Sequence, residues 1–241
     1  MNNSSRTYSI YSILEAGQAE LVNHGAIELD AKLEANILLS HVLAKPKSYL
    51  HAWPEQLLTL GQVAMYFAVI NRRCNGEPIA YITGQKEFFS LVFNVDSSVL
   101  IPRPETELLV ETILQKFKLK ENDSLNILDL GTGSGAIAIS LAKARPNWLI
   151  TAVDNSEAAL AVAQQNARIH NANNIKFIKA DCNDFKDISG VFYSFQFDYV
   201  FHYAALVGVQ RTLDNPVQVL NDITGLKNIL GLCKNSGVKR V

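Results

Sequence analysis

The sequence predicts an α/β protein in which a Rossmann-like parallel sheet follows a small all-α N-terminal domain and a β-hairpin linker. From Asn126 onward, short apolar runs alternate with helical patterns, an order that is typical of a parallel sheet. Up to about residue 75, apolar residues instead recur at helical spacing. We therefore expect a helical domain over residues 1–80, a hairpin linker over residues 81–104 and a sheet domain over residues 105–241.

Composition narrows the class of protein. The 241 residues are 48% hydrophobic, enough for one large or two small domains, and their net charge of −1 argues against a strongly electrostatic nucleic-acid binder. The three cysteines form no CxxC pair, which fits a reducing compartment, and the five histidines show no metal spacing. No segment approaches the ~20 apolar residues of a membrane span. We expect a cytoplasmic protein with no membrane, metal or direct nucleic-acid partner.

The first domain reads as three or four short helices between about Tyr8 and Asn75, one of them ended by Lys45-Pro46. Their apolar positions form a core, or alternatively a surface that presents a substrate.

The linker changes character. Alternating residues predict a strand over Phe89–Val95, with Val99–Ile101 as its hairpin partner. Pro102 and Pro104 then fix an extended backbone around Arg103, and a helix follows over Glu105–Lys118. The guanidinium of Arg103 suits a ligand-facing loop; an ion pair with Glu105 or Glu107 is the structural alternative.

In the expected sheet domain, short apolar runs predict four strands followed by the start of a fifth. The strands are Ile127–Leu130, Leu149–Val153, Ile175–Ile178, Tyr199–Phe201 and, at its beginning, Val238–Val241; the intervening helices include 137–144, 157–170 and 214–235.

A glycine-rich turn follows the first strand, and its pattern is compatible with two different ligands. Gly131-x-Gly133-x-x-Ala136, with Asp154 for a ribose, fits a dinucleotide. Alternatively, Asp129 precedes a GxGxG turn, and Asp154 and Asp181 end the next two strands. Three carboxylates at successive strand ends favour a cationic ligand without phosphates, such as S-adenosylmethionine (SAM), because a pyrophosphate prefers helix-terminal N–H groups.

Two strings resemble the release-factor glutamine methyltransferases of the HemK/PrmC type: Val99-Leu-Ile-Pro-Arg-Pro-Glu-Thr-Glu107 and Ile127-Leu-Asp-Leu-Gly-Thr-Gly-Ser-Gly-Ala-Ile-Ala138. The resemblance covers roughly residues 8–185. It implies SAM-dependent methylation of a glutamine side-chain amide in peptide chain release factors, with residues 1–80 as a substrate-recognition domain. The cofactor residues that it implies, together with the neighbouring loop, are Asp129, Gly131, Thr132, Gly133, Ser134, Gly135, Asp154, Asp181, Cys182, Arg103 and Thr106. The family usually has an aromatic residue in place of Cys182.

The sequence departs from that family after the fourth strand, where the family carries Asn-Pro-Pro-Tyr. Here Tyr203, Ala204, Ala205 and Leu206 stand instead, so no catalytic residue is assigned. From about residue 191 to 241 the chain resembles an internal piece of the NAD-dependent nucleotide-sugar epimerases, which are extended short-chain dehydrogenases, although their Tyr-xxx-Lys pair is absent. We thus expect a truncated or chimeric methyltransferase sheet, with an exposed edge and apolar surface around the fourth strand.

Three functions follow from these patterns. The first is a SAM-dependent protein-(glutamine-N5) methyltransferase. The second is an inactive or SAM-binding-only fusion product that lacks the amide-binding motif. The third is a fragment of an NAD-dependent sugar epimerase or dehydratase.

Overall fold

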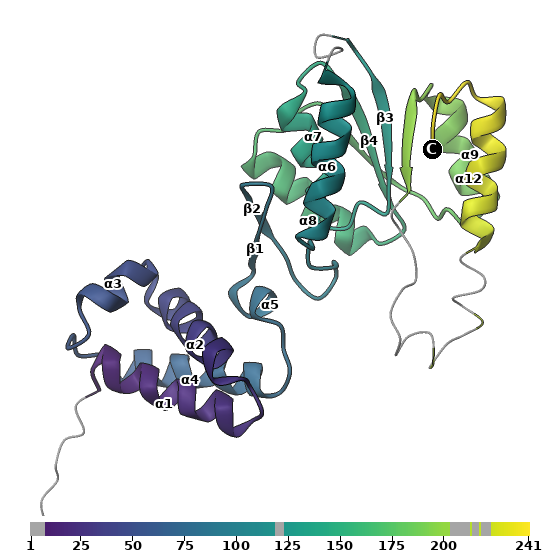
Figure 1. The fold of residues 1–241 in the computed structure, drawn as a ribbon. Helices are drawn as coiled ribbons and strands as arrows, with labels where there is room; N and C mark the ends of the chain where they lie inside the picture. Colours follow the sequence, from purple (N-terminus) through teal and green to yellow (C-terminus); the bar gives the residue numbers. More distant parts are fainter. Residues whose placement is uncertain (1–7, 119–122, 203–212, 214–216, 218–222) are drawn as a thin grey trace, which may run out of the picture. The chain divides into compact units, whose positions relative to one another are not determined.

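Five helices form the first part of the chain in the computed structural model, which describes residues 8–118, 123–202, 213, 217 and 223–241. They are α1 (Ile10–Asn23), α2 (Glu28–Leu43), α3 (Lys47–Ala52), α4 (Leu60–Cys74) and α5 (Ile79–Thr83) (Figure 1). Together they make one compact unit, Met1–Gly84, and Gln85–Val241 makes a second. The helical N-terminal segment predicted from the sequence is confirmed.

Capping boxes start two of these helices. The Ser9 hydroxyl accepts from the N–H of Ser12 at 3.2 Å, and the Thr59 hydroxyl accepts from the N–H of Gln62 at 3.2 Å. Each serves a donor that the first turn of a helix leaves without an intrahelical partner. Apolar residues of α1, α2 and α4 then pack into one core.

Tyr66 is the largest side chain in this core. It is fully buried on α4, and its hydroxyl donates to the carbonyl of Ala35 on α2 at 3.4 Å. Its ring lies against Gly17 of α1, where an added Cβ would come within 2.1 Å of the hydroxyl oxygen. The absence of a side chain at position 17 therefore decides how closely α1 and α4 approach.

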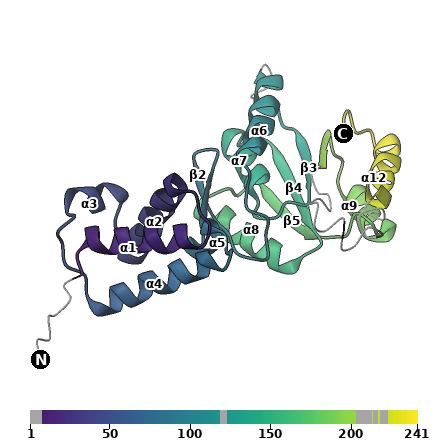
Figure 2. The ribbon, with the colours of Figure 1, turned by 60° about the horizontal axis from the view of Figure 1, so that its bottom comes forward.

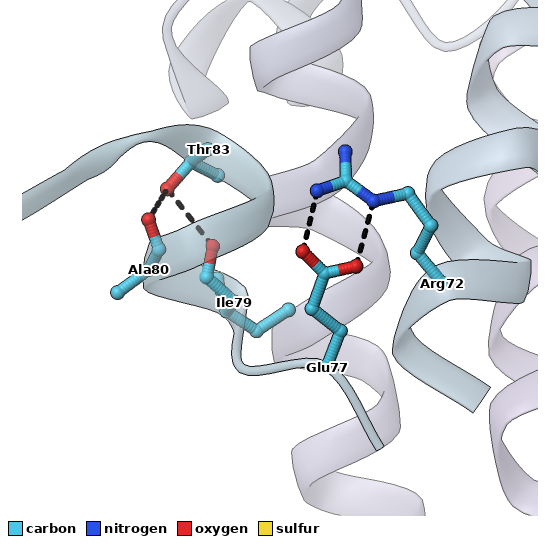
Figure 3. Close-up of polar contacts among 5 residues, drawn as sticks. All are labelled: Arg72, Glu77, Ile79, Ala80 and Thr83. Carbon is cyan, nitrogen blue, oxygen red and sulfur yellow. Dashed lines mark hydrogen bonds and ion pairs between the residues drawn. The ribbon is translucent and has the colours of Figure 1, made fainter. Parts of the chain in front are cut away.

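Two arginines near the end of α4 form bidentate ion pairs. Arg73 binds Glu34 of α2 with distances of 2.8 and 2.9 Å. Arg72 binds Glu77, in the loop that leads to α5, and its hydrogen bonds lower the pKa of the Glu77 carboxyl (Figure 3). On α5 the Thr83 hydroxyl donates back to the carbonyl of Ile79 at 3.0 Å. These contacts fix the last turns of the helical unit.

A hairpin opens the second unit, but not the hairpin that the alternation predicts. The structure pairs β1 (Gln85–Phe88) with β2 (Leu91–Asn94) in an antiparallel ladder, and Val99–Ile101 belongs to no strand. The prediction of a strand over Phe89–Val95 is confirmed for Leu91–Asn94, whereas the predicted partner, Val99–Ile101, was wrong because the strand pairs with the preceding segment. Phe89 and Ser90 form the two-residue turn, with φ of 49° and 58°. Such turns are usually signalled by Asn-Gly, and Phe-Ser gives no such signal.

Within the described residues, four parallel strands form the sheet in the order β5-β4-β3-β6. They are β3 (Asn126–Leu130), β4 (Leu149–Asp154), β5 (Ile175–Lys179) and β6 (Tyr199–His202), close to the predicted strands. Ile127 of the central strand β3 pairs with Ile150 of β4 and with Tyr199 of β6. The chain moves outward from β3 to β5 and then returns to place β6 on the other side of β3, which creates a topological switch point.

Helices cover both faces of this sheet (Figure 2). On one face, α6 (Glu105–Lys116), α7 (Ala136–Ala144) and α8 (Glu157–Ile169) share a core with Ile127 and the hairpin. On the other, α9 (Phe185–Ser194) and α12 (Ile223–Asn235) pack against Leu128 and Leu130. The predicted Rossmann-like arrangement is confirmed.

The segment that resembles an epimerase is joined to the sheet by specific contacts. The N–H of Gly225 donates to Asn183 Oδ1 at 2.8 Å, and the Asn228 side chain donates to the carbonyl of Cys182 at 2.9 Å. The predicted fifth strand is reduced to an isolated bridge between Arg240 and Tyr199, beside which the N–H of Lys239 donates to the carbonyl of Asp198 at 2.8 Å. The expected helix start at Asp214 and the segment Tyr203–Leu206 lie outside the described residues.

An apolar groove of about 280 Å³ lies along β6, in the region where apolar surface was expected. Its lining includes Leu109 of α6, Phe117 directly after that helix, and Tyr199, Phe201 and Leu226. Within the described residues, no helix is long and apolar enough to cross a membrane.

Substituting Gly17 tests the packing of the helical unit. We expect Gly17→Ala to lower the free energy of unfolding by about 1–3 kcal/mol, because the new methyl group overlaps the buried Tyr66 ring. Gly61→Ala is the matched control in α4: its Cβ meets nothing closer than 4.0 Å, so this variant keeps or slightly raises stability. Urea unfolding followed by circular dichroism measures both. Equal stability of the two variants would refute the packing described here.

Candidate cofactor site

The glycine turn lies at the carboxyl end of the central strand. Gly131, Gly133 and Gly135 all have positive φ, of 72°, 55° and 79°. The N–H groups of Gly131 and Thr132 donate to the carbonyl of Val153 at 2.8 and 3.0 Å, which anchors the turn to β4. Side chains rarely adopt these backbone angles, so glycine is required for the chain to turn sharply from β3 into α7.

The last two glycines of the turn face different surroundings. A Cβ on Gly135 would lie 2.8 Å from Ile139 and 3.2 Å from Ala163, so this glycine allows α7 and α8 to pack closely. A Cβ on Gly133 would meet nothing within 4 Å. Gly133 therefore presents bare backbone to open space, as a turn that holds a ligand must.

Asp129 is buried on β3 directly before this turn, with 1% of its surface exposed. The described part of the chain offers its Oδ2 atom no hydrogen-bond partner. Burial raises the pKa of the Asp129 carboxyl to about 6; the nearby charge of Asp154 acts in the same direction and the Thr132 hydroxyl opposes it. At neutral pH the site thus holds a buried negative charge, and a cationic group is the ligand that would stabilise it.

Asp154 has a structural role that the sequence did not reveal. One carboxylate oxygen accepts from the N–H of Gly133 at 2.9 Å, and the other accepts from the N–H of Ser156 at 3.0 Å. Ser156 in turn caps α8 through the N–H of Ala159. The carboxylate therefore joins the glycine turn to the start of the next helix, and each oxygen keeps lone-pair capacity for a further donor.

The remaining predicted cofactor-site residues are less closely connected to the glycine turn. Asp181 follows β5, two strands from the turn, and its Oδ1 accepts from the N–H of Asn183 at 2.8 Å. Arg103 is exposed, and its carbonyl accepts from the N–H of Thr106 at the start of α6. Over the described residues no ion pair links Arg103 to Glu105 or Glu107, and no hydrogen bond links the side chain of Arg103 or Thr106 to the glycine turn. The structure brings together Asp129, the turn and Asp154.

One buried polar residue near the turn was missed. The side chain of Asn166 on α8 donates to the carbonyl of Ser134 at 2.9 Å and also binds the backbone of the hairpin. An asparagine within the apolar face of a helix was the available signal, because buried amides are almost always hydrogen-bonded.

Comparison with protein families matches both units of the chain. Residues 12–84 match the PrmC N-terminal domain, and residues 121–238 match a methyltransferase domain. The second match includes the segment that resembles an epimerase in sequence.

Curated relatives give a consistent description. The chain is 51% identical over 146 residues to the release factor glutamine methyltransferase of Coxiella burnetii, covering 61% of this chain and 52% of the relative. It is 41% identical over 169 residues to the protein of the same name from Shewanella oneidensis, covering 70% and 58%. The chain thus spans little more than half the length of the curated relatives it matches. The resemblance predicted from the sequence is confirmed, and the methyltransferase domain supports SAM as the cofactor.

The solved structures do not distinguish between the candidate ligands. A UDP-glucose-4-epimerase from Stenotrophomonas maltophila with bound NAD aligns at 23% identity and a TM-score of 0.40, over 47% of this chain and 34% of that one. A score this low carries no argument about the ligand, so the likeness of the C-terminal segment to epimerases stays a prediction.

The stability of an Asp129→Asn variant tests the buried charge. The folded-state pKa of about 6 lies above the ordinary value of 3.8 for an aspartate, so between these pH values the folded state holds a proton that the unfolded state has released. The wild type therefore loses stability as pH rises through this window, and the variant does not. We expect the stability difference to shift in favour of Asp129→Asn by about 3 kcal/mol between pH 3.5 and 7.5. Parallel curves in urea-unfolding experiments across this range would contradict a raised pKa.

Proposed function

We propose that this chain binds SAM at the glycine turn and acts in the methylation of a glutamine side-chain amide in a peptide chain release factor. The observation that carries the proposal is the unpartnered, buried carboxylate oxygen of Asp129 beside a turn of bare backbone. The matches to a PrmC N-terminal domain and a methyltransferase domain support it.

Each acidic residue has a proposed role that its surroundings support. Asp129 accepts from the ammonium of the methionine moiety, since its free oxygen calls for a cationic donor. Asp154, which already fixes Gly133, accepts from the ribose hydroxyls, and Asp181, with Cys182 next to it, borders the adenine. Thr132 and Ser134 complete the wall of the turn, and Arg103 and Thr106 shape the loop before α6. When bound, SAM supplies an electrophilic methyl group that is displaced from its sulfonium.

The acceptor side of the site distinguishes transfer from binding alone. An amide nitrogen is a poor nucleophile, because its lone pair is delocalised into the carbonyl, and it has to be held in line with the methyl group. The relatives' family uses Asn-Pro-Pro-Tyr for this, whereas Tyr203, Ala204, Ala205 and Leu206 occupy these positions here. This replacement favours a second candidate function: a protein that binds SAM without transferring its methyl group.

The protein partner follows from the same relatives. We propose a release factor as the substrate, with the helical unit, residues 1–84, as the part that recognises it, and the cytoplasm as the place of reaction. The support is the PrmC N-terminal match and the printed name of the relatives.

Calorimetric titration tests the cofactor. We expect S-adenosylhomocysteine to bind the full chain with one site and NAD to give no heat of binding. Asp129→Asn is expected to weaken S-adenosylhomocysteine at least about tenfold, because it removes a charge-assisted hydrogen bond to the ammonium. Binding of NAD in place of S-adenosylhomocysteine would refute the proposal and favour the epimerase fragment.

Mass spectrometry separates transfer from binding. A release factor incubated with the chain and SAM gains one methyl group on a glutamine if the first function is correct. If the cofactor binds and no methyl group appears, the chain is a SAM-binding protein without transferase activity.

A further inference from the structure

A single side chain on α8 connects the cofactor turn to the hairpin. Asn166 is completely buried. Its Oδ1 accepts from the N–H of Asn94 at 2.8 Å, and its Nδ2 donates to the carbonyl of Asn94 at 2.9 Å. The same Nδ2 donates to the carbonyl of Ser134 in the glycine turn at 2.9 Å. Both donors and the acceptor of one amide are therefore used, and every partner is backbone.

The hydrogen bonds between Asn166 and Asn94 take the place of those that a third strand would make. The hairpin has only two strands, which is marginal for stability without support from elsewhere. The amide of Asn166 meets the N–H and the carbonyl of Asn94 as the peptide group of a neighbouring strand would. The outer edge of β2 is thereby hydrogen-bonded to a helix side chain.

A second contact one helical turn further on holds β2 as well. His170 Nε2 lies 2.8 Å from the carbonyl of Val92, and its ring packs 5.2 Å from the ring of Phe93. Residues four apart share one face of a helix, so Asn166 and His170 both bind the same strand, β2. Of these two side chains, Asn166 is the one that also reaches the glycine turn, so it forms a hydrogen-bonded connection between turn and hairpin.

We propose that Asn166 is a positioning residue that couples cofactor binding to the order of the hairpin. A ligand that restrains the glycine turn fixes the carbonyl of Ser134, and through Asn166 it restrains Asn94. By thermodynamic reciprocity, a hairpin that is held in place strengthens ligand binding. Because β1 begins at Gln85, directly after the helical unit, cofactor occupancy then sets the mobility of the segment that leads from one unit to the other. This inference rests on the proposed binding of SAM.

Two alanine variants separate coupling from simple loss of stability. Asn174 is the matched control: its Nδ2 also serves three backbone carbonyls, those of Ala142, Arg145 and Trp148, at the opposite end of the sheet. We expect Asn166→Ala to weaken S-adenosylhomocysteine about tenfold or more in calorimetric titration. Asn174→Ala is expected to lower the melting temperature while keeping the dissociation constant within about twofold of the wild type, because its contacts do not reach the turn.

Amide hydrogen exchange distinguishes coupling from a purely structural role of Asn166, because a loss of stability alone would not abolish the effect of the ligand on exchange. In the wild type, saturating S-adenosylhomocysteine slows amide exchange in residues 91–94, and in Asn174→Ala it does the same. In Asn166→Ala, exchange in these residues is faster and is insensitive to the ligand. Equal ligand affinity of the two variants, or ligand-dependent protection that persists in Asn166→Ala, would overturn the coupling.

The wild type alone also decides the matter if Asn166→Ala does not fold. Binding of S-adenosylhomocysteine without any protection of residues 91–94 refutes the coupling and leaves the proposed function intact. No binding to the wild type refutes the proposed function, and the coupling with it.

Discussion

The burial of one carboxylate at the end of a central strand is the constraint on which the site depends. Asp129 loses its hydration on β3, and the described residues leave its Oδ2 unpaired, so the folded chain holds an anion that a bound cationic donor would stabilise. The raised pKa of its carboxyl records this cost. Such a group is unfavourable for folding alone, and its presence in an otherwise well-packed sheet is most simply explained by a ligand.

The surrounding structure holds the ligand side of that carboxylate in place. Asp154 fixes the N–H of Gly133, Val153 anchors the start of the turn, and Asn166 fixes the carbonyl of Ser134. These contacts come from β4 and α8, so the turn is part of the sheet and its covering helices and not a free loop. The same helix also holds the hairpin, which gives the region its proposed coupling. On the other face, Asn228 and Gly225 attach α12 to the loop after β5, so this C-terminal helix is packed into the same unit as the sheet.

Much of this arrangement was predictable from the sequence, and the exceptions have physical reasons. Buried parallel strands leave apolar runs, and a turn with positive φ needs glycine, so the sheet and the turn were found close to their observed bounds. The hairpin register was missed because Phe89 and Ser90 adopt left-handed angles without Asn or Gly. The contacts of Asn166 and the bond from Gly133 to Asp154 were missed because they join segments far apart in the sequence, and no local pattern encodes the partner.

The pH dependence of ligand affinity tests the central role of Asp129 most directly. The dissociation constant of S-adenosylhomocysteine is to be measured by calorimetry between pH 5 and 7.5 for the wild type and Asp129→Asn. Because the free carboxyl has a pKa of about 6 and binds the ligand ammonium only when ionised, wild-type affinity rises about tenfold over this range and levels off above pH 7. The variant binds weakly at every pH. A wild-type affinity that does not change with pH would contradict the account.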